Sequence, residues 1–125
     1  MSTPENKGAH ILVVDDEPVV SDCLKRMLIL DGHTVETATC GVEALAQFED
    51  GKFDLVFLDY EMPDMRGDEL ALLIKALAPK QPIVMVTAYP KTLKGNLLTE
   101  VELIISKPFD PQELRSAAKK LLKRT

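Results

Sequence analysis

Four short apolar runs divide the chain, and segments with helical spacing lie between them. The runs cover residues 11–14, 55–58, 83–86 and 103–105. Apolar runs of this length, bounded by polar residues, are typical of buried strands. Their alternation with helical segments predicts repeated βα units around a parallel sheet, which restricts the chain to α/β folds.

The segments between the runs complete the expected order of elements. We expect helices over residues 18–30 and about 42–48. Residues 34–38 alternate polar and apolar side chains, which predicts a less covered strand at the edge of the sheet. Residues 88–101 contain Gly95 and Asn96 near their centre, so a short or irregular fourth helix is expected there.

Two later helices have the clearest signals. Leu70, Leu73, Ile74 and Leu77 have the spacing of one helical face, which we expect to cover the sheet. The last helix opens with the pattern of an N-cap, a first-turn proline and a capping box in residues 110–113. Its expected buried residues are Leu114, Ala117, Ala118, Leu121 and Leu122.

Composition limits the class of protein. With 125 residues, of which 46% are hydrophobic, we expect one domain over residues 10–125 after a flexible leader of residues 1–9. The net charge of -5 argues against direct nucleic-acid binding. No apolar stretch approaches the roughly 20 residues that cross a bilayer, and no signal peptide is recognisable, so membrane insertion is not expected. Cys23 and Cys40 follow no metal or CxxC spacing, which favours a cytoplasmic location.

Each apolar run is followed by polar residues that form one chemical set. Asp15 and Asp16 follow the first run, Asp59 the second, Thr87 the third and Lys107 the fourth. In a parallel sheet these residues gather at the carboxyl edge, where open α/β sheets place their ligands. Three neighbouring carboxylates repel one another, and a divalent cation removes that cost. Oxygen ligands favour Mg2+, and the absence of Cys and His from the set disfavours zinc.

A carboxylate in such a set can also act as a nucleophile toward phosphorus. Asp59 is the best candidate because it follows the most hydrophobic run. The cation would then contact one phosphoryl oxygen, Lys107 a second, and either the Thr87 hydroxyl or nearby backbone N–H groups a third. Taken singly, each residue has a plainer interpretation: a helix cap for Asp15 and Asp16, a loop acid, a structural threonine and a solvated lysine. Their occurrence after successive runs favours the functional interpretation.

Four segments of the chain resemble one known family. They are residues 11–18 (ILVVDDEP), 55–67 (LVFLDYEMPDMRG), 86–88 (VTA) and 106–109 (SKPF). Together they resemble the receiver domain of two-component response regulators, over almost the whole chain from residue 10. The resemblance implies a flavodoxin-like, doubly wound (βα)5 fold, with a five-stranded parallel sheet in the order 2-1-3-4-5.

The same resemblance implies a function and a role for each site residue. Asp59 would accept a phosphoryl group from a histidine kinase or a histidine phosphotransfer protein and switch the conformation to control a downstream protein. Mg2+ would be held by Asp16, Asp59 and the backbone carbonyl of Glu61, with Asp15 acting through water. Thr87 and Lys107 match the phosphate-sensing residues, and the peptide bond from Lys107 to Pro108 is expected to be cis.

The chain departs from the family pattern near its output surface. Ile104 stands where receivers carry an aromatic ring that moves with the threonine, and we hypothesise that Tyr89 supplies part of that role. The segment from Thr87 to Lys107 is also shorter than in common receivers and lacks their Ala-Gly step, so a standard symmetric dimer is possible but not assured. Glu61 adds negative charge beside the site, so we expect it to slow phosphoryl transfer or to pair with Lys107.

Two other functions fit parts of the pattern. A Mg2+-dependent phosphatase of the haloacid dehalogenase type also uses an aspartate nucleophile, but places it after the first strand in a DxD arrangement. A docking domain on a receiver fold would need no phosphorylation. The first is disfavoured by the order of the acids, and the second by the presence of all five chemical residues.

Overall fold

The computed structural model describes residues 8–88 and 101–122, in which strands and helices alternate. The strands are β1 (His10–Val14), β2 (Thr34–Ala38), β3 (Leu55–Asp59), β4 (Ile83–Thr87) and β5 (Leu103–Ser106). The helices are α1 (Pro18–Leu30), α2 (Gly41–Gln47), α3 (Gly67–Leu77) and α5 (Pro111–Leu122). The expected fourth helix and most of the expected leader lie outside these residues.

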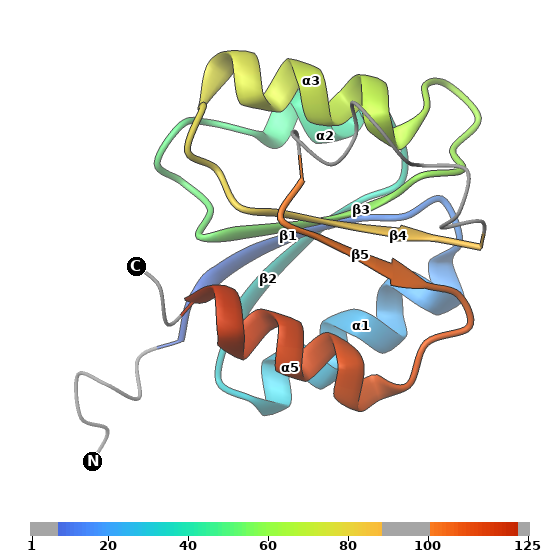
Figure 1. Ribbon diagram of the computed structural model, residues 1–125, viewed down its shortest axis with the longest axis vertical. Coiled ribbons are helices and arrows are strands. Elements are labelled where there is room, and N and C mark those ends of the chain that lie inside the picture. The colour runs from blue at the N-terminus through green and yellow to red at the C-terminus, as the bar shows by residue number, and fades with distance from the viewer. Residues whose placement is uncertain (1–7, 89–100, 123–125) are drawn as a thin grey trace.

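All five strands of the described chain pair in parallel, in the order β2-β1-β3-β4-β5. This confirms the predicted flavodoxin-like order and the edge position of β2. The chain reverses its direction of travel across the sheet between β1 and β3. β1 and β3 lie side by side in the sheet (Figure 1). Their carboxyl ends flank the switch point at which such folds bind ligands.

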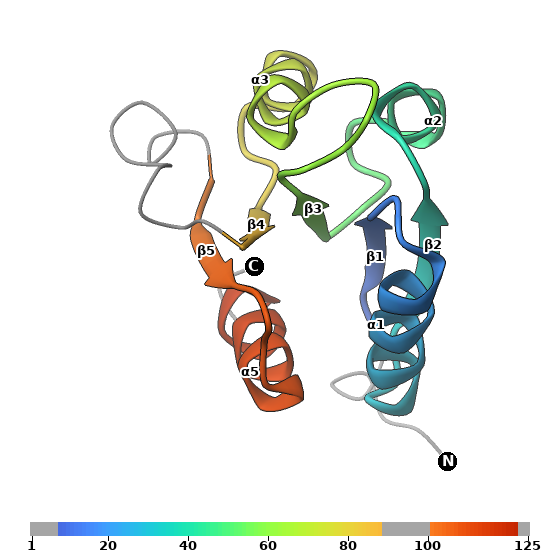
Figure 2. The same ribbon diagram turned by 90° about the vertical axis from the view of Figure 1, so that its right-hand side faces the viewer.

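The sheet lies between two layers of helices, with α2 and α3 on one face and α1 and α5 on the other (Figure 2). Side chains alternate along each strand, so β1 sends Leu12 and Val14 toward α2 and α3, and Ile11 and Val13 toward α1 and α5. Both faces of β1, β3 and β4 are buried, which explains why these strands appear in the sequence as continuous apolar runs.

Helix α3 covers the sheet with a different face from the one predicted. Leu70 and Ile74 are buried as expected, but Leu73 and Leu77 are 44% and 56% exposed. The buried face instead adds two small residues, Gly67 and Ala71. A Cβ atom on Gly67 would lie 2.7 Å from the backbone oxygen of Asp59, so the close approach of helix and strand requires glycine there. The prediction relied on the spacing of the large leucines and therefore assigned the neighbouring face of the helix to the core.

The predicted N-terminal signal of α5 is confirmed. Four of the five expected residues of this helix are buried, and the fifth, Leu122, is only partly buried. The backbone N–H of Asp110 donates to Glu113 Oε1 at 3.0 Å, and Asp110 Oδ1 accepts from the N–H of Gln112 at 2.9 Å, which forms the expected cap of α5. The peptide bond between Lys107 and Pro108 is cis, as the resemblance implied. Within residues 8–88 and 101–122, no helix has the length and apolar character needed to cross a membrane.

Candidate functional site

The polar residues that follow the apolar runs meet at the carboxyl edge of the sheet. Asp59 and Thr87 are the last residues of β3 and β4, and Asp15 and Lys107 directly follow β1 and β5. The parallel register keeps these ends level, because Asp59 pairs with Val86 across to β4. Asp15 and Asp59 are only 2% exposed and Thr87 is fully buried. The predicted convergence of these four residues is confirmed.

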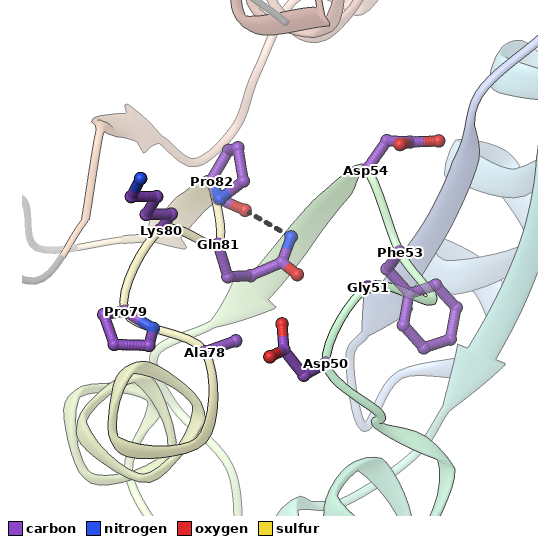
Figure 3. A pocket seen from close by; sticks show the side chains of 9 residues that line it. All are labelled: Asp50, Gly51, Phe53, Asp54, Ala78, Pro79, Lys80, Gln81 and Pro82. Atoms are coloured by element: carbon purple, nitrogen blue, oxygen red, sulfur yellow. Dashed lines mark hydrogen bonds between the residues drawn. The ribbon is translucent and has the colours of Figure 1, made fainter.

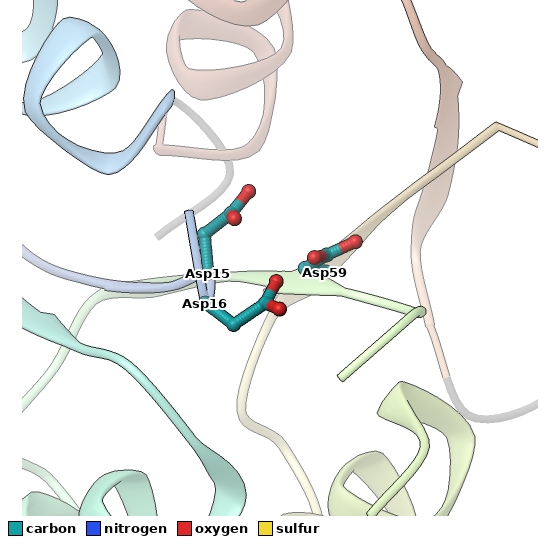
Figure 4. A group of neighbouring side chains, drawn as sticks. All are labelled: Asp15, Asp16 and Asp59. Carbon is teal, nitrogen blue, oxygen red and sulfur yellow. The ribbon is translucent and has the colours of Figure 1, made fainter. Parts of the chain in front are cut away.

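Three carboxylates form an acidic cluster at this edge. One oxygen from each of Asp15, Asp16 and Asp59 lies within 4.8 Å of the other two. Asp15 and Asp16 come from the end of β1, and Asp59 comes from the neighbouring strand β3 (Figure 4). Asp16 is partly buried, so the cluster opens toward solvent on its side.

Lys107 supplies a positive charge to the acidic cluster. Its Nζ donates to Asp59 Oδ1 at 3.0 Å and lies 3.8 Å from Asp15 Oδ2. The lysine side chain is 19% exposed, which weakens the solvent screening of both contacts. The lysine therefore binds the two most buried carboxylates and reaches them across β4 from the end of the edge strand β5.

Three carboxylates near one ammonium leave an excess of negative charge. This excess and the burial of the site shift the pKa values of its residues. Burial raises the pKa of Asp59 to about 7; the nearby charge of Asp15 adds to this effect, and Lys107 opposes it. Burial also raises the pKa of Asp15. Burial alone would lower the pKa of Lys107, but its hydrogen bond to Asp59 and the charge of Asp15 raise it instead.

Backbone groups hold the carboxylates in place. The N–H of Glu17 donates to Asp15 Oδ1 at 2.8 Å, and the N–H of Glu61 donates to Asp59 Oδ1 at 3.3 Å. The loop after β3 is closed by the N–H of Gly67, which donates to the carbonyl of Tyr60 at 2.8 Å. These short local bonds orient the two buried acids before any ligand arrives.

The donor set fits a hard divalent cation. The cluster offers carboxylate oxygens alone, with no sulfur or imidazole among them, and this chemistry suits Mg2+ better than zinc. The excess of negative charge at the site also gives a cation a favourable place to bind. Participation of the Glu61 backbone carbonyl stays a prediction.

The side chain of Glu61 has a partner that the sequence did not indicate. The Thr87 hydroxyl donates to Glu61 Oε2 at 2.6 Å. Among the described residues, Lys107 forms ion pairs with Asp15 and Asp59, so the alternative in which Glu61 pairs with Lys107 is wrong. The other alternative, that Glu61 slows phosphoryl transfer, stays a prediction. Glu61 and Thr87 are 26 positions apart, and their contact depends on the neighbouring ends of β3 and β4. No local sequence pattern predicts such a contact.

The altered output region is only partly described. Ile104 lies in β5 opposite Met85 of β4 and packs, partly buried, against the core beneath α2 and α3. Tyr89, the suggested substitute for the missing aromatic ring, lies outside the described residues. The hypothesis about Tyr89 therefore stays a prediction.

A pocket at the opposite edge of the sheet lacks this chemistry. It has a volume of about 370 Å3 and is lined by the loops that precede β3 and β4 (Figure 3). Asp50 faces it, but the Gln81 amide is bonded to the carbonyl of Pro82 at 3.2 Å. None of the predicted site residues lines this pocket.

The sequence is similar to known response regulators. The family model described as the response regulator receiver domain matches residues 11–119. Response regulator MprA of Mycobacterium ulcerans is 35% identical over 120 residues, which make up 94% of this chain and 52% of that protein. The transcriptional regulatory protein TcrA of Mycobacterium tuberculosis is 33% identical over 119 residues, 94% of this chain and 47% of that protein. The chain thus spans about half the length of these relatives.

Solved structures show the same likeness. Response regulator TrrA of Thermotoga maritima, in complex with Mg2+ and BeF, has 38% identity and a TM-score of 0.84, and the match covers 90% of this chain and 98% of that one. A CheY-like receiver domain protein of Methanospirillum hungatei has 31% identity and a TM-score of 0.84, covering 94% and 96%. With the strand order and the acidic cluster facing a lysine, these matches show that the chain belongs to the receiver domain family of two-component response regulators.

Proposed function

We propose that this receiver domain is a phosphoacceptor whose Asp59 carboxylate takes a phosphoryl group from a phosphohistidine of a kinase or phosphotransfer protein. The observation that carries the proposal is the position of Asp59. Its carboxylate is buried at the end of a central strand, 3.0 Å from Lys107 Nζ and within the acidic cluster. A nucleophilic carboxylate beside a fixed positive charge is the arrangement that phosphoryl transfer requires.

The transfer is a displacement at phosphorus. A carboxylate oxygen of Asp59 forms the new bond to phosphorus while the bond from phosphorus to the donor imidazole nitrogen breaks, and the imidazole leaves. Lys107 offsets negative charge on the phosphoryl oxygens from its place beside Asp59. The Thr87 hydroxyl is the second side-chain donor at this edge, once its proton is available to a phosphoryl oxygen.

Mg2+ is the cofactor that the site fits. Asp16, Asp59 and the backbone carbonyl of Glu61 would hold it, with Asp15 acting through water. When bound, it would neutralise charge on the carboxylates and on the phosphoryl oxygens. The complex of TrrA with Mg2+ and BeF supports this assignment. The side chains of this chain supply the orientation, because the N–H groups of Glu17 and Glu61 fix two of the three carboxylates.

Phosphorylation adds about two negative charges to an edge that already carries an excess. The movement of Lys107 and Thr87 toward the new group would shift the balance between two conformations and so control a downstream protein partner. Thr87 ends β4 and Lys107 directly follows β5, which supports that side of the sheet as the route to the partner.

Incubation with acetyl phosphate and Mg2+ tests the proposal without the unidentified kinase. Intact-protein mass spectrometry should show one added phosphoryl group, formed only when Mg2+ is present and absent from an Asp59→Ala variant. Asp50→Ala is the matched control, because Asp50 is an exposed acid at the opposite edge and should leave labelling unchanged. Absence of labelling would favour a docking domain, and continuous release of phosphate from varied phosphoesters would favour a phosphatase.

A further inference from the structure

The Glu61 carboxylate accepts a hydrogen bond from the Thr87 hydroxyl. Thr87 Oγ1 donates to Glu61 Oε2 at 2.6 Å, and the threonine is completely buried. The backbone N–H of the same glutamate donates to Asp59 Oδ1 at 3.3 Å. Glu61 therefore contacts both the nucleophile on β3 and the hydroxyl on β4.

A hydroxyl group has a single proton to donate. While the Thr87 proton is directed to the Glu61 carboxylate, the hydroxyl has no second proton for an oxygen on Asp59. A carboxylate is also a stronger acceptor than a neutral group, so the contact is costly to break in a buried position.

We propose that Glu61 is a positioning residue that holds the Thr87 hydroxyl in the unphosphorylated state, so that a phosphoryl group on Asp59 must displace its carboxylate. The proposal rests on the proposed function, because it describes what opposes phosphorylation at that site. In this proposal, the Glu61 carboxylate and the phosphoryl group compete for the single proton of the Thr87 hydroxyl. Each phosphorylated molecule has exchanged the Glu61 contact of Thr87 for a contact with a phosphoryl oxygen.

A plainer effect of Glu61 would be the repulsion of the incoming group by its negative charge. The two effects differ in their dependence on Thr87. Repulsion acts whether or not residue 87 carries a hydroxyl, whereas competition for the proton disappears with that hydroxyl. A double-mutant cycle between positions 61 and 87 therefore separates them.

The cycle uses beryllofluoride with Mg2+ as an equilibrium mimic of the phosphoryl group, with binding followed by calorimetry. Glu61→Ala should bind the mimic about ten-fold more tightly than the natural chain, the lower end of what a hydrogen bond to a charged acceptor contributes. In a Thr87→Val background, which keeps the shape and removes the hydroxyl, the same change at residue 61 should alter affinity less than about two-fold.

Glu61→Gln provides a second readout that needs no change at Thr87. The amide oxygen of Gln still accepts the hydroxyl proton, but the negative charge is gone. The proposal predicts an affinity for beryllofluoride between that of the natural chain and that of Glu61→Ala, because a neutral amide holds the hydroxyl proton less strongly than a carboxylate does. An affinity equal to that of Glu61→Ala would show that charge alone acts and would overturn it.

The cycle and the labelling test of the proposed function fail in different ways. Phosphorylation of the natural chain by acetyl phosphate, together with a Glu61→Ala effect that persists in the Thr87→Val background, would refute the competition and leave the phosphoacceptor function intact. Failure of the natural chain to be phosphorylated would refute the function itself. Far-ultraviolet circular dichroism of each variant verifies that the fold is retained.

Discussion

The Asp59 carboxylate is placed by backbone groups that lie directly around it. Gly67, the first residue of α3, approaches so closely that an added Cβ would lie 2.7 Å from the Asp59 backbone oxygen and 2.8 Å from Tyr60 Cα. These are main-chain atoms, which cannot rotate away as a side chain can. A single glycine therefore determines how near α3 comes to the nucleophile.

Replacement of Gly67 by Ala should destabilise the fold by roughly 1–3 kcal/mol, the usual cost of overpacking. It should also slow phosphorylation by acetyl phosphate, because the loop that holds Asp59 must move. Urea unfolding and labelling rates measure the two effects.

Gly41→Ala is a matched control for Gly67→Ala. Gly41 is also the first residue of a helix, but the three atoms nearest to its Cβ would all belong to the flexible side chain of Met65. The cost should be smaller and the labelling rate unchanged. Equal effects of the two substitutions would show that the contact beneath Asp59 has no special importance.

At the scale of elements, side chains from distant segments secure the helices around the site. Asp64, in the loop that follows β3, accepts the N–H groups of Gly41 and Val42 at 2.9 and 3.0 Å and so caps α2. Asp31, at the end of α1, accepts two hydrogen bonds from Arg115 of α5, at 2.9 and 2.7 Å. Each contact joins a helix to an element that is remote in the sequence.

The pair between α1 and α5 should make stability depend on pH. Its hydrogen bonds from Arg115 hold the pKa of Asp31 below its ordinary value of 3.8. The pair therefore contributes stability above that value and loses it as the pH falls through the lower pKa of the folded state. Urea unfolding should show that Arg115→Met destabilises slightly near neutral pH and that the difference disappears in acid.

A substitution of an exposed cation elsewhere controls for the change in net charge. Lys80 lies at the far edge of the sheet, beside the pocket. The Lys80→Met variant should differ from the natural chain in stability by an amount that does not depend on pH. A difference between the natural chain and Arg115→Met that stays constant down to strongly acidic pH would contradict the assigned role of Asp31.

For the whole molecule, folding brings the like charges of the acidic cluster close together at the carboxyl edge of the sheet. Three carboxylates meet one ammonium at the carboxyl ends of the sheet, and their burial adds to the cost. Strands β1, β3 and β4 are packed on both faces by apolar side chains. A cation at this edge should therefore increase the stability of the fold.

Mg2+ at ten times its dissociation constant should raise the free energy of unfolding by about 1.4 kcal/mol. The Asp16→Asn variant should show a much smaller gain, because it lacks one proposed ligand. The Asp50→Asn variant removes an acid outside the cluster and should gain as much as the natural chain. Urea titrations with and without Mg2+ measure these differences, and an equal gain in Asp16→Asn would argue against its role as a ligand.

Much of this architecture could be predicted from the chain alone because it depends on local patterns. Buried parallel strands appear as apolar runs, so the residues after each run, such as Asp59 and Thr87, were located correctly at one edge. The cap of α5 was also predicted, because its two partners lie three residues apart.

The features that were missed depend on contacts across the fold. The face of α3 was assigned from its large leucines, whereas the close approach of Gly67 to β3 selects a face with small residues. The partner of Glu61 depends on the spacing of β3 and β4. The cap that Asp64 provides to α2 joins residues more than twenty positions apart. Local periodicity carries no information about any of these contacts.

The central claim is that Asp59 is the phosphoacceptor, and identification of the modified residue tests it most directly. After incubation with acetyl phosphate and Mg2+, borohydride reduces an aspartyl phosphate to homoserine, which peptide mass spectrometry locates in the chain. The account predicts homoserine at position 59 and nowhere else. Homoserine at position 15 or 16, or unmodified Asp59 in a chain that has gained a phosphoryl group, would contradict it.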